Sequence, residues 1–222
     1  MKSQGALVYW FDLAPEMIDE WVEWYIRDHM PSRVGATFSA AHCFRAVGSK
    51  PAFLAYYEAE TAEALLAPEY LALLRKPSTD DRLRRGWYLN TVRATCRVCA
   101  SLGHGQGGVA ATIRVSPPAA SRLQIRERLV DDVAPFLAQT KRVGAVQILE
   151  ADNEIRTNMD EARVTGQADG SADWVIRVDA AREEDIAGAI ARLNEFRAWK
   201  ELGLMDTAIL GSYRLLYSIS SN

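Results

Sequence analysis

The order strand, helix, strand, strand, helix, strand occurs twice in this 222-residue sequence, and this repetition constrains the fold more than any other feature. The first run extends over residues 6–98 and the second over residues 109–220. Two helices can cover only one face of a four-stranded sheet, so the other face of each sheet needs a partner. A period of about one hundred residues is too long for a solenoid and indicates duplicated domains.

The predicted strands are apolar on both faces. In "PAFLAYYEAE", one face carries Phe53, Ala55 and Tyr57, and the other carries Leu54 and Tyr56. Neither face is suited to water, so each sheet should pack against helices on one side and against the second sheet on the other. The sequence therefore predicts an α+β fold of two tandem ferredoxin-like β-α-β-β-α-β units that pack sheet to sheet within one chain.

Proline and glycine residues mark the boundaries. Pro15 begins the first helix, which we expect to run to about His29 and to stop before Pro31. A second helix, residues 61–75, is expected to break at Pro68. The glycine-rich segment 101–108 reads as a flexible connector. We therefore expect a first domain at residues 1–100, the linker, and a second domain at residues 109–222.

Composition narrows the function classes. The net charge of −3 gives no electrostatic reason to expect nucleic acid or an anionic membrane as partner. No apolar run approaches the roughly 18 residues of a membrane span, and the N-terminus lacks the features of a signal peptide. Three cysteines, an odd number, favour a reducing compartment. We expect a soluble cytoplasmic protein.

Three segments of the first run carry a family resemblance: "WYIRDHMPSRV" at residues 24–34, "SAAHCFRAV" at 39–47 and "LLAPEYLALL" at 65–74. They resemble EthD-like members of the dimeric α+β barrel superfamily; for residues 109–220 the likeness lies only in the order of elements. The resemblance implies an intramolecular barrel with a pocket between sheet and helices. Such relatives include cofactor-free cyclases, isomerases, dehydratases and monooxygenases, and also heme-binding enzymes.

His29 is the residue that we expect to carry acid–base chemistry. Ile18, Val22, Tyr25 and His29 are spaced four, three and four residues apart, so they share one helix face, which packs on the sheet. An imidazole titrates near neutral pH and can act as a general acid or base at the rim of that space. The alternative is that His29 only caps the last carbonyls of its helix before Pro31. The EthD-like pattern also has a histidine at this helix end.

Other candidates would bind a substrate. Tyr25, Tyr56 and Tyr57 could donate hydrogen bonds to a substrate carbonyl, and His42 lies on an apolar strand. Residues of these types in such positions are more often ordinary core residues. Trp87, together with Arg84 and Arg85 in "DDRLRRGWY", could clamp an anionic group, although this run is also typical of a solvated loop.

We expect no metal and no cofactor, because "CRVC" (Cys96 to Cys99) has no second pair of ligands. The leading interpretation is a cofactor-free enzyme that acts on a small hydrophobic or aromatic compound with His29 as acid or base. A non-catalytic binding or interaction barrel is the alternative, and a heme-binding barrel with His29 or His42 as axial ligand is a third class. Two chains could also associate as a homodimer.

Overall fold

The computed structural model describes residues 4–35, 37–164, 166 and 168–221, and it places all strands of this part of the chain in one closed barrel. The strands are β1 (Gly5–Asp12), β2 (Ala40–Ala46), β3 (Phe53–Ala59), β4 (Leu89–Gly103), β5 (Val109–Val115), β6 (Val143–Ala151), β7 (Trp174–Ala180) and β8 (Ile209–Ser220). Their order around the barrel is β1-β3-β2-β8-β5-β7-β6-β4.

Each half of the barrel has the ferredoxin-like strand order. The first half reads β4-β1-β3-β2 and the second β8-β5-β7-β6, with antiparallel neighbours throughout. Pairing of β2 with β8 and of β4 with β6 closes the two sheets into one ring. The predicted fold, two ferredoxin-like units packed sheet to sheet within one chain, is confirmed.

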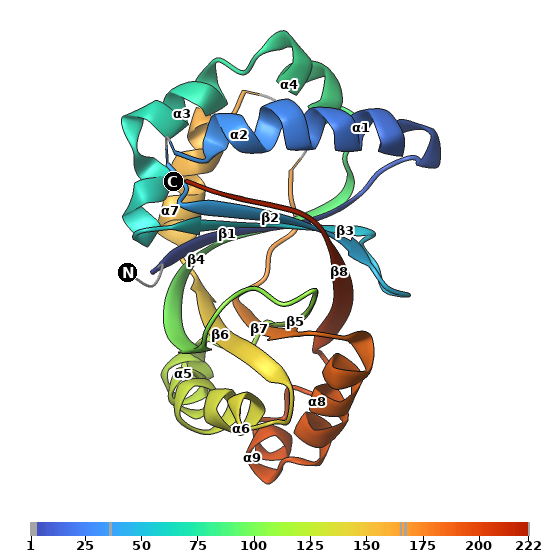
Figure 1. Cartoon of the computed structure of the whole chain (residues 1–222). Helices are drawn as coiled ribbons and strands as arrows, with labels where there is room; N and C mark the ends of the chain where they lie inside the picture. The colour runs from blue at the N-terminus through green and yellow to red at the C-terminus, as the bar shows by residue number, and fades with distance from the viewer. Residues whose placement is uncertain (1–3, 36, 165, 167, 222) are drawn as a thin grey trace.

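Two helical layers cover the outside of the barrel (Figure 1). The upper layer contains α1 (Ile18–Trp24), a π-helix (Tyr25–His29), α2 (Met30–Arg33), α3 (Pro68–Arg75), α4 (Thr79–Arg85) and α7 (Asn153–Ala162). The lower layer contains α5 (Arg122–Arg128), a second π-helix (Leu129–Val133), α6 (Ala134–Ala138), α8 (Glu183–Glu195) and α9 (Arg197–Glu201). In the described residues, no helix has both the length and the apolar character that crossing a bilayer requires.

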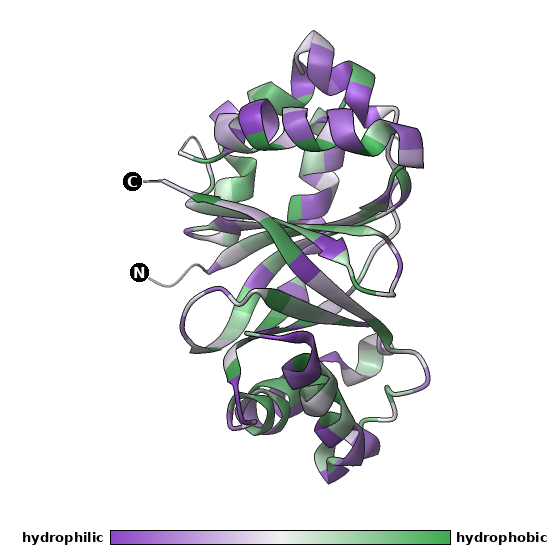
Figure 2. Cartoon of the chain, turned by 45° about the vertical axis from the view of Figure 1, so that its right-hand side comes forward, coloured by the Kyte–Doolittle hydropathy of each residue, from purple (hydrophilic) through white to green (hydrophobic). Residues whose placement is uncertain are grey.

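The alternation of side chains along the strands separates three cores. Trp10, Phe44, Tyr56 and Tyr213 point into the barrel and are fully buried there. Their strand neighbours face a helical layer instead, and hydrophobic segments run along the strands between the two layers (Figure 2). Complete burial of one phenylalanine-sized side chain contributes roughly 1.5–3 kcal/mol. Contact with helices outside and with the opposite sheet inside thus explains why both strand faces are apolar.

The sequence predicted that the first helix stops before Pro31, and this prediction is wrong. The helix passes through the π-helix at Tyr25–His29 and continues to Arg33. In the wider π turn, the Met30 amide donates to the Tyr25 carbonyl, five residues back, which changes the backbone spacing just ahead of the proline. Because backbone helix continues past His29, its side chain does not serve as a helix-end cap.

Two further helices were not predicted. The run "DDRLRRGWY", interpreted as a solvated loop, contains all of α4 except Thr79, and the Ser78 side chain caps this helix by accepting from the Asp81 amide. α7 is inserted between β6 and β7, where the sequence predicted no helix. β4 also extends to Gly103, three residues into the predicted connector.

α7 belongs to the second half in sequence but packs on the helices of the first half. Ile155, Met159 and Ala162 lie in the hydrophobic core beneath the upper helical layer, and α7 contacts α3. Figure 1 shows α7 (orange) beside α3, on the far side of the sheets from α8 and α9. The second half therefore supplies part of the wall around the first half's helix–sheet space.

Candidate functional site

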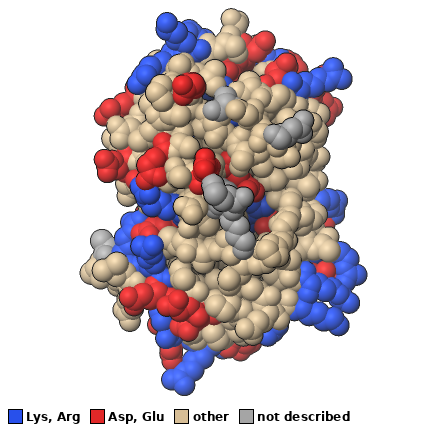
Figure 3. Space-filling view, turned by 60° about the vertical axis from the view of Figure 1, so that its left-hand side comes forward, with Lys and Arg blue, Asp and Glu red and all other residues tan. Residues whose placement is uncertain are grey.

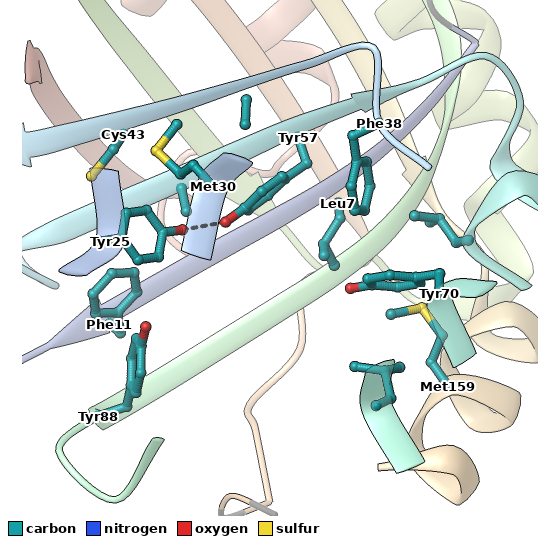
Figure 4. Packing of buried hydrophobic residues seen from close by; sticks show 14 of the residues in the cluster. Leu7, Phe11, Tyr25, Met30, Phe38, Cys43, Tyr57, Tyr70, Tyr88 and Met159 are labelled. Atoms are coloured by element: carbon teal, nitrogen blue, oxygen red, sulfur yellow. Dashed lines mark hydrogen bonds between the residues drawn. The ribbon is translucent and has the colours of Figure 1, made fainter. Parts of the chain in front are cut away.

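A cavity of about 90 Å³ lies between the upper helical layer and the sheet of the first half. β1, β3 and β4 form its floor, the π-helix and α2 form one wall, and α3, α4 and the segment after α7 close the others. Figure 4 shows several of the lining side chains approaching one another from these elements. The lining residues are Leu7, Tyr9, Tyr25, His29, Arg33, Phe38, Tyr57, Tyr70, Leu74, Arg85, Tyr88, Thr91, Arg93, Arg163 and Gly166.

His29 lines this cavity and is held by Asp81 of α4. Its Nδ1 lies 2.9 Å from Oδ1 of Asp81, and Nη2 of Arg33 donates to Oδ2 of the same carboxylate at 3.1 Å. All three side chains are largely buried, with 14 % of His29 and 10 % of Asp81 exposed. The π-helix places Tyr25 and His29, four residues apart, on one side of the helix, where their rings stack 5.0 Å apart.

The protonation states of this pair follow from the surroundings. Burial lowers the pKa of His29 to about 4, against the raising effect of the hydrogen bond with Asp81. Although burial opposes ionisation of Asp81, the hydrogen bond from His29 and the charge of Arg33 hold the pKa of Asp81 below its ordinary value. At neutral pH an ionised Asp81 can only accept, so Nδ1–H of neutral His29 donates to it. This leaves Nε2 of His29 unprotonated and able to act as a base.

Two buried tyrosines form a hydrogen-bonded pair next to His29. The hydroxyl groups of Tyr25 and Tyr57 lie 2.5 Å apart, as the dashed line in Figure 4 marks. Burial raises the pKa of both phenols, so both stay protonated at neutral pH. One hydroxyl donates to the other, and the second proton remains for an acceptor, such as a ligand oxygen in the cavity that both side chains line.

The rest of the cavity wall is rich in arginine. Arg33, Arg85, Arg93 and Arg163 line it together with five tyrosines. Their carboxylate partners lie behind them: Asp81 bonds Arg33, Asp160 pairs with Arg93, and Asp169 pairs with Arg93 and Arg163. The Tyr9 hydroxyl also donates to Asp169 at 3.3 Å. Three of these groups, Asp160, Arg163 and Asp169, come from α7 and the segment that follows it.

The structure brings only some of the predicted site residues together. His29, Tyr25 and Tyr57 line the same cavity. His42 and Tyr56 lie on the opposite face of the sheet: His42 bonds Ser218 at 2.8 Å and Glu58 at 3.1 Å, and the Tyr56 hydroxyl donates to Gln147 inside the barrel.

Trp87 does not line the cavity either. It contacts the guanidinium of Arg84, which lies 5.4 Å from the Trp87 ring centre and also lies over Trp24. Arg84 forms ion pairs with Glu20 and Asp80 near the surface. Arg85, the other arginine of the run "DDRLRRGWY", is the one that reaches the cavity.

Sequence reasoning missed Asp81, the residue that orients His29. A usable signal was present: Ser78 precedes Asp81 by three residues, and its hydroxyl accepts from the Asp81 amide at 3.0 Å, a helix N-cap that predicts the start of α4. No local signal indicated that Arg93 of β4 and Arg163 after α7 share one cavity. That proximity depends on how β4, β6 and α7 are placed in space.

A heme group does not fit this cavity. Pockets for drug-sized ligands have volumes of roughly 300–1,000 Å³, whereas this cavity offers about 90 Å³. Trp21, Tyr25 and His29 are also stacked on one another, so no open space lies over the imidazole plane on that side. Across the described ranges, no three metal-ligating side chains of the His, Cys, Asp or Glu type come together.

No protein-family model and no curated protein sequence matches this chain. Solved structures match over nearly its whole length. An anthrone oxidase-like protein has a TM-score of 0.66 at 14 % identity, covering 99 % of this chain and 94 % of its own. A chlorite dismutase mutant from Candidatus Nitrospira defluvii has a TM-score of 0.56 at 12 % identity, covering 96 % and 92 %.

A third match is a ferredoxin-fold protein of Listeria monocytogenes that is related to antibiotic biosynthesis monooxygenases. Its TM-score is 0.51 at 12 % identity, covering 97 % of this chain and 96 % of its own. Identities this low carry information on the fold alone. The chain therefore has the fold shared by the dimeric α+β barrel proteins, closed here within a single polypeptide.

Proposed function

We propose that this protein is an acid–base enzyme that needs no cofactor and abstracts a proton from a small aromatic compound with an enolisable or phenolic group. The observation that carries the proposal is the buried His29–Asp81 pair, with a neutral imidazole on the cavity wall beside the Tyr25–Tyr57 pair. An oriented base next to a hydroxyl donor is the arrangement that proton abstraction beside a carbonyl requires.

The proposed step uses each group at a stated atom. Nε2 of His29 takes the proton from the substrate, and the carboxylate of Asp81 stabilises the imidazolium that forms. The remaining hydroxyl proton of the Tyr25–Tyr57 pair donates to the oxygen on which negative charge develops. Isomerisation, cyclisation and cofactor-free oxidation by dioxygen can all begin with such a carbanion. The anthrone oxidase-like and monooxygenase-related structural neighbours support this reaction class by analogy.

His29→Asn tests the proposal. Small enolisable aromatic ketones such as 2-tetralone are incubated with the protein in D₂O, and the loss of the α-proton signal is followed by NMR. The native chain should accelerate exchange, and His29→Asn should slow it by at least a factor of about 10², since general-base catalysis contributes 10²–10⁴. His104→Asn is the matched control, because His104 is exposed and lies outside the cavity. Equal exchange rates for native and His29→Asn protein would contradict the proposal.

A binding protein without catalysis is the second candidate, favoured by the small volume of the cavity. In that case, compounds found by thermal-shift screening would bind to the native chain without any exchange or turnover. Loss of their binding in His29→Asn would still locate them in this cavity, whereas unchanged binding would place them elsewhere.

A further inference from the structure

We propose that the substrate of this cavity is an anion, an aromatic carboxylate whose acid group is bound by Arg85 at the edge of the cavity. The inference rests on the proposed function for the use of the cavity, and it adds the charge and the orientation of the ligand. The inference is argued from the charged groups that face the cavity and from those that lie behind its wall.

The cavity wall is positively charged. Its lining includes four arginines, and no aspartate or glutamate is among the described residues that line it. The carboxylates that pair with these arginines, Asp81, Asp160 and Asp169, contact them from outside the lining. Toward the cavity, the described lining therefore presents guanidinium groups and no carboxylate.

The positive groups act on the same space. Burial raises the pKa of Tyr70, and all four of Arg33, Arg93, Arg85 and Arg163 oppose that rise through their charges. Arg33 and Arg85 likewise help to lower the pKa of His29. Charges that favour the phenolate form of Tyr70 also favour a bound anion nearby, and partial burial strengthens their effect because water screens it less.

Arg85 is the arginine best placed to bind the carboxylate. It lies at the C-terminal end of α4, one turn after Asp81, and is only half-buried, so it joins the cavity to the surface. The planar guanidinium can donate two parallel hydrogen bonds to a carboxylate. Apolar groups from Leu7, Phe38 and Leu74 line the cavity for the ring. The phenol or carbonyl oxygen attached to the ring would then point toward the Tyr25–Tyr57 pair and His29.

Two probes of nearly equal shape separate charge from packing. 4-Hydroxybenzoate and 4-hydroxybenzamide differ in charge but share the ring and the phenol group. Isothermal titration of the native full-length chain should give an affinity for the benzoate at least about tenfold higher than for the amide. A hydrogen bond between charged groups contributes enough binding free energy for a difference of this size. Arg85→Gln should remove this preference by weakening the benzoate and leaving the amide unchanged. Arg85→Lys should retain part of it.

Arg82→Gln is the matched control, because Arg82 lies on the same helix, is exposed and is absent from the cavity lining. It should bind both probes as the native chain does. Equal affinities for the two probes in the native chain, an equal loss of both in Arg85→Gln, or no binding of either probe would overturn the inference. Circular dichroism of each variant separates a binding defect from misfolding.

The same experiment separates this inference from the proposed function. If the charge preference is present but α-proton exchange is absent from native protein, the cavity binds aromatic anions without the proposed chemistry. If exchange depends on His29 but the probes bind equally, the function stands and the anionic substrate is wrong.

Discussion

At the scale of single residues, the central feature is a histidine that burial keeps neutral although it bonds a carboxylate. The pKa of His29 falls to about 4 because desolvation outweighs the attraction of Asp81. Among the described residues, the Asp81 carboxylate fixes which ring nitrogen carries the proton. Asp81 therefore acts by positioning His29, and Arg33 holds Asp81 from its other oxygen.

The depressed pKa of His29 also predicts a dependence of stability on pH. The unfolded chain binds a proton at His29 below pH 6.5 or so, whereas the folded chain resists it down to about pH 4. Above pH 6.5, where His29 is neutral in both states, it should not reduce the free energy of unfolding. Between about pH 6.5 and pH 4 the unfolded chain takes up this proton first, and the free energy of unfolding should fall by about 3 kcal/mol over that range.

Urea titrations at pH 7 and pH 4 check this prediction against His29→Gln, which keeps an amide donor for Asp81. The variant should lose less stability than the native chain between the two pH values. Parallel losses in both proteins would show that other groups account for the acid sensitivity.

At the scale of elements, α4 matters because it carries both Asp81 and Arg85. Its N-cap is Ser78, whose hydroxyl accepts from the Asp81 amide. Ser78→Ala should lower the free energy of unfolding by about 1 kcal/mol, as the loss of an N-cap does, and should also slow proton exchange by loosening Asp81. Urea denaturation and the NMR exchange assay measure the two effects. Thr79→Ala, an exposed neighbouring change, should alter neither; equal effects of both would contradict the role of the cap.

The elements also show how far the sequence alone could lead. The strands were predictable because "ALVYWFD" and "PAFLAYYEAE" are apolar on both faces, a local property. α4 was missed because it is short and polar. α7 was missed because its apolar residues are few, Ile155, Met159 and Ala162, and polar residues separate them. The course of the first helix past Pro31 depends on a π turn, which has no known sequence signal here.

The candidate site was predictable only in part, for the same reason. Tyr25 and His29 share a helix, so their spacing indicated a common face. The contact between His29 and Asp81 joins residues 52 positions apart, and Arg163 reaches the cavity from the other half of the chain. Such contacts depend on tertiary structure, which short-range periodicity does not contain.

At the scale of the whole molecule, α7 ties the two halves together. Met159 is fully buried in the core of the first half although it belongs to the second. Charges of both signs are interspersed over the face shown in Figure 3. The buried Met159 contact, the ion pairs of Arg93 with Asp160 and Asp169, and the shared barrel connect the halves. They should unfold together.

Met159→Ala should therefore lower the free energy of unfolding of the entire chain by about 2–5 kcal/mol and keep a single transition. It should also weaken 4-hydroxybenzoate binding, since α7 leads directly into Arg163. Urea denaturation followed by both tryptophan fluorescence and circular dichroism measures the first effect, and titration the second. Thr157→Ala, on the exposed side of α7, is the control. Two separate transitions in the native chain would contradict the coupling.

Closure of the barrel within one polypeptide has a consequence for its evolution. When two identical chains build such a barrel, twofold symmetry repeats every mutation in both sheets. Here the second π-helix ends in a buried valine, Val133, two residues before Pro135, where the first has His29 two residues before Pro31. Each half can thus change independently. The first half has His29 at this position, whereas the second half has Val133 there and contributes α7 to the core of the first half.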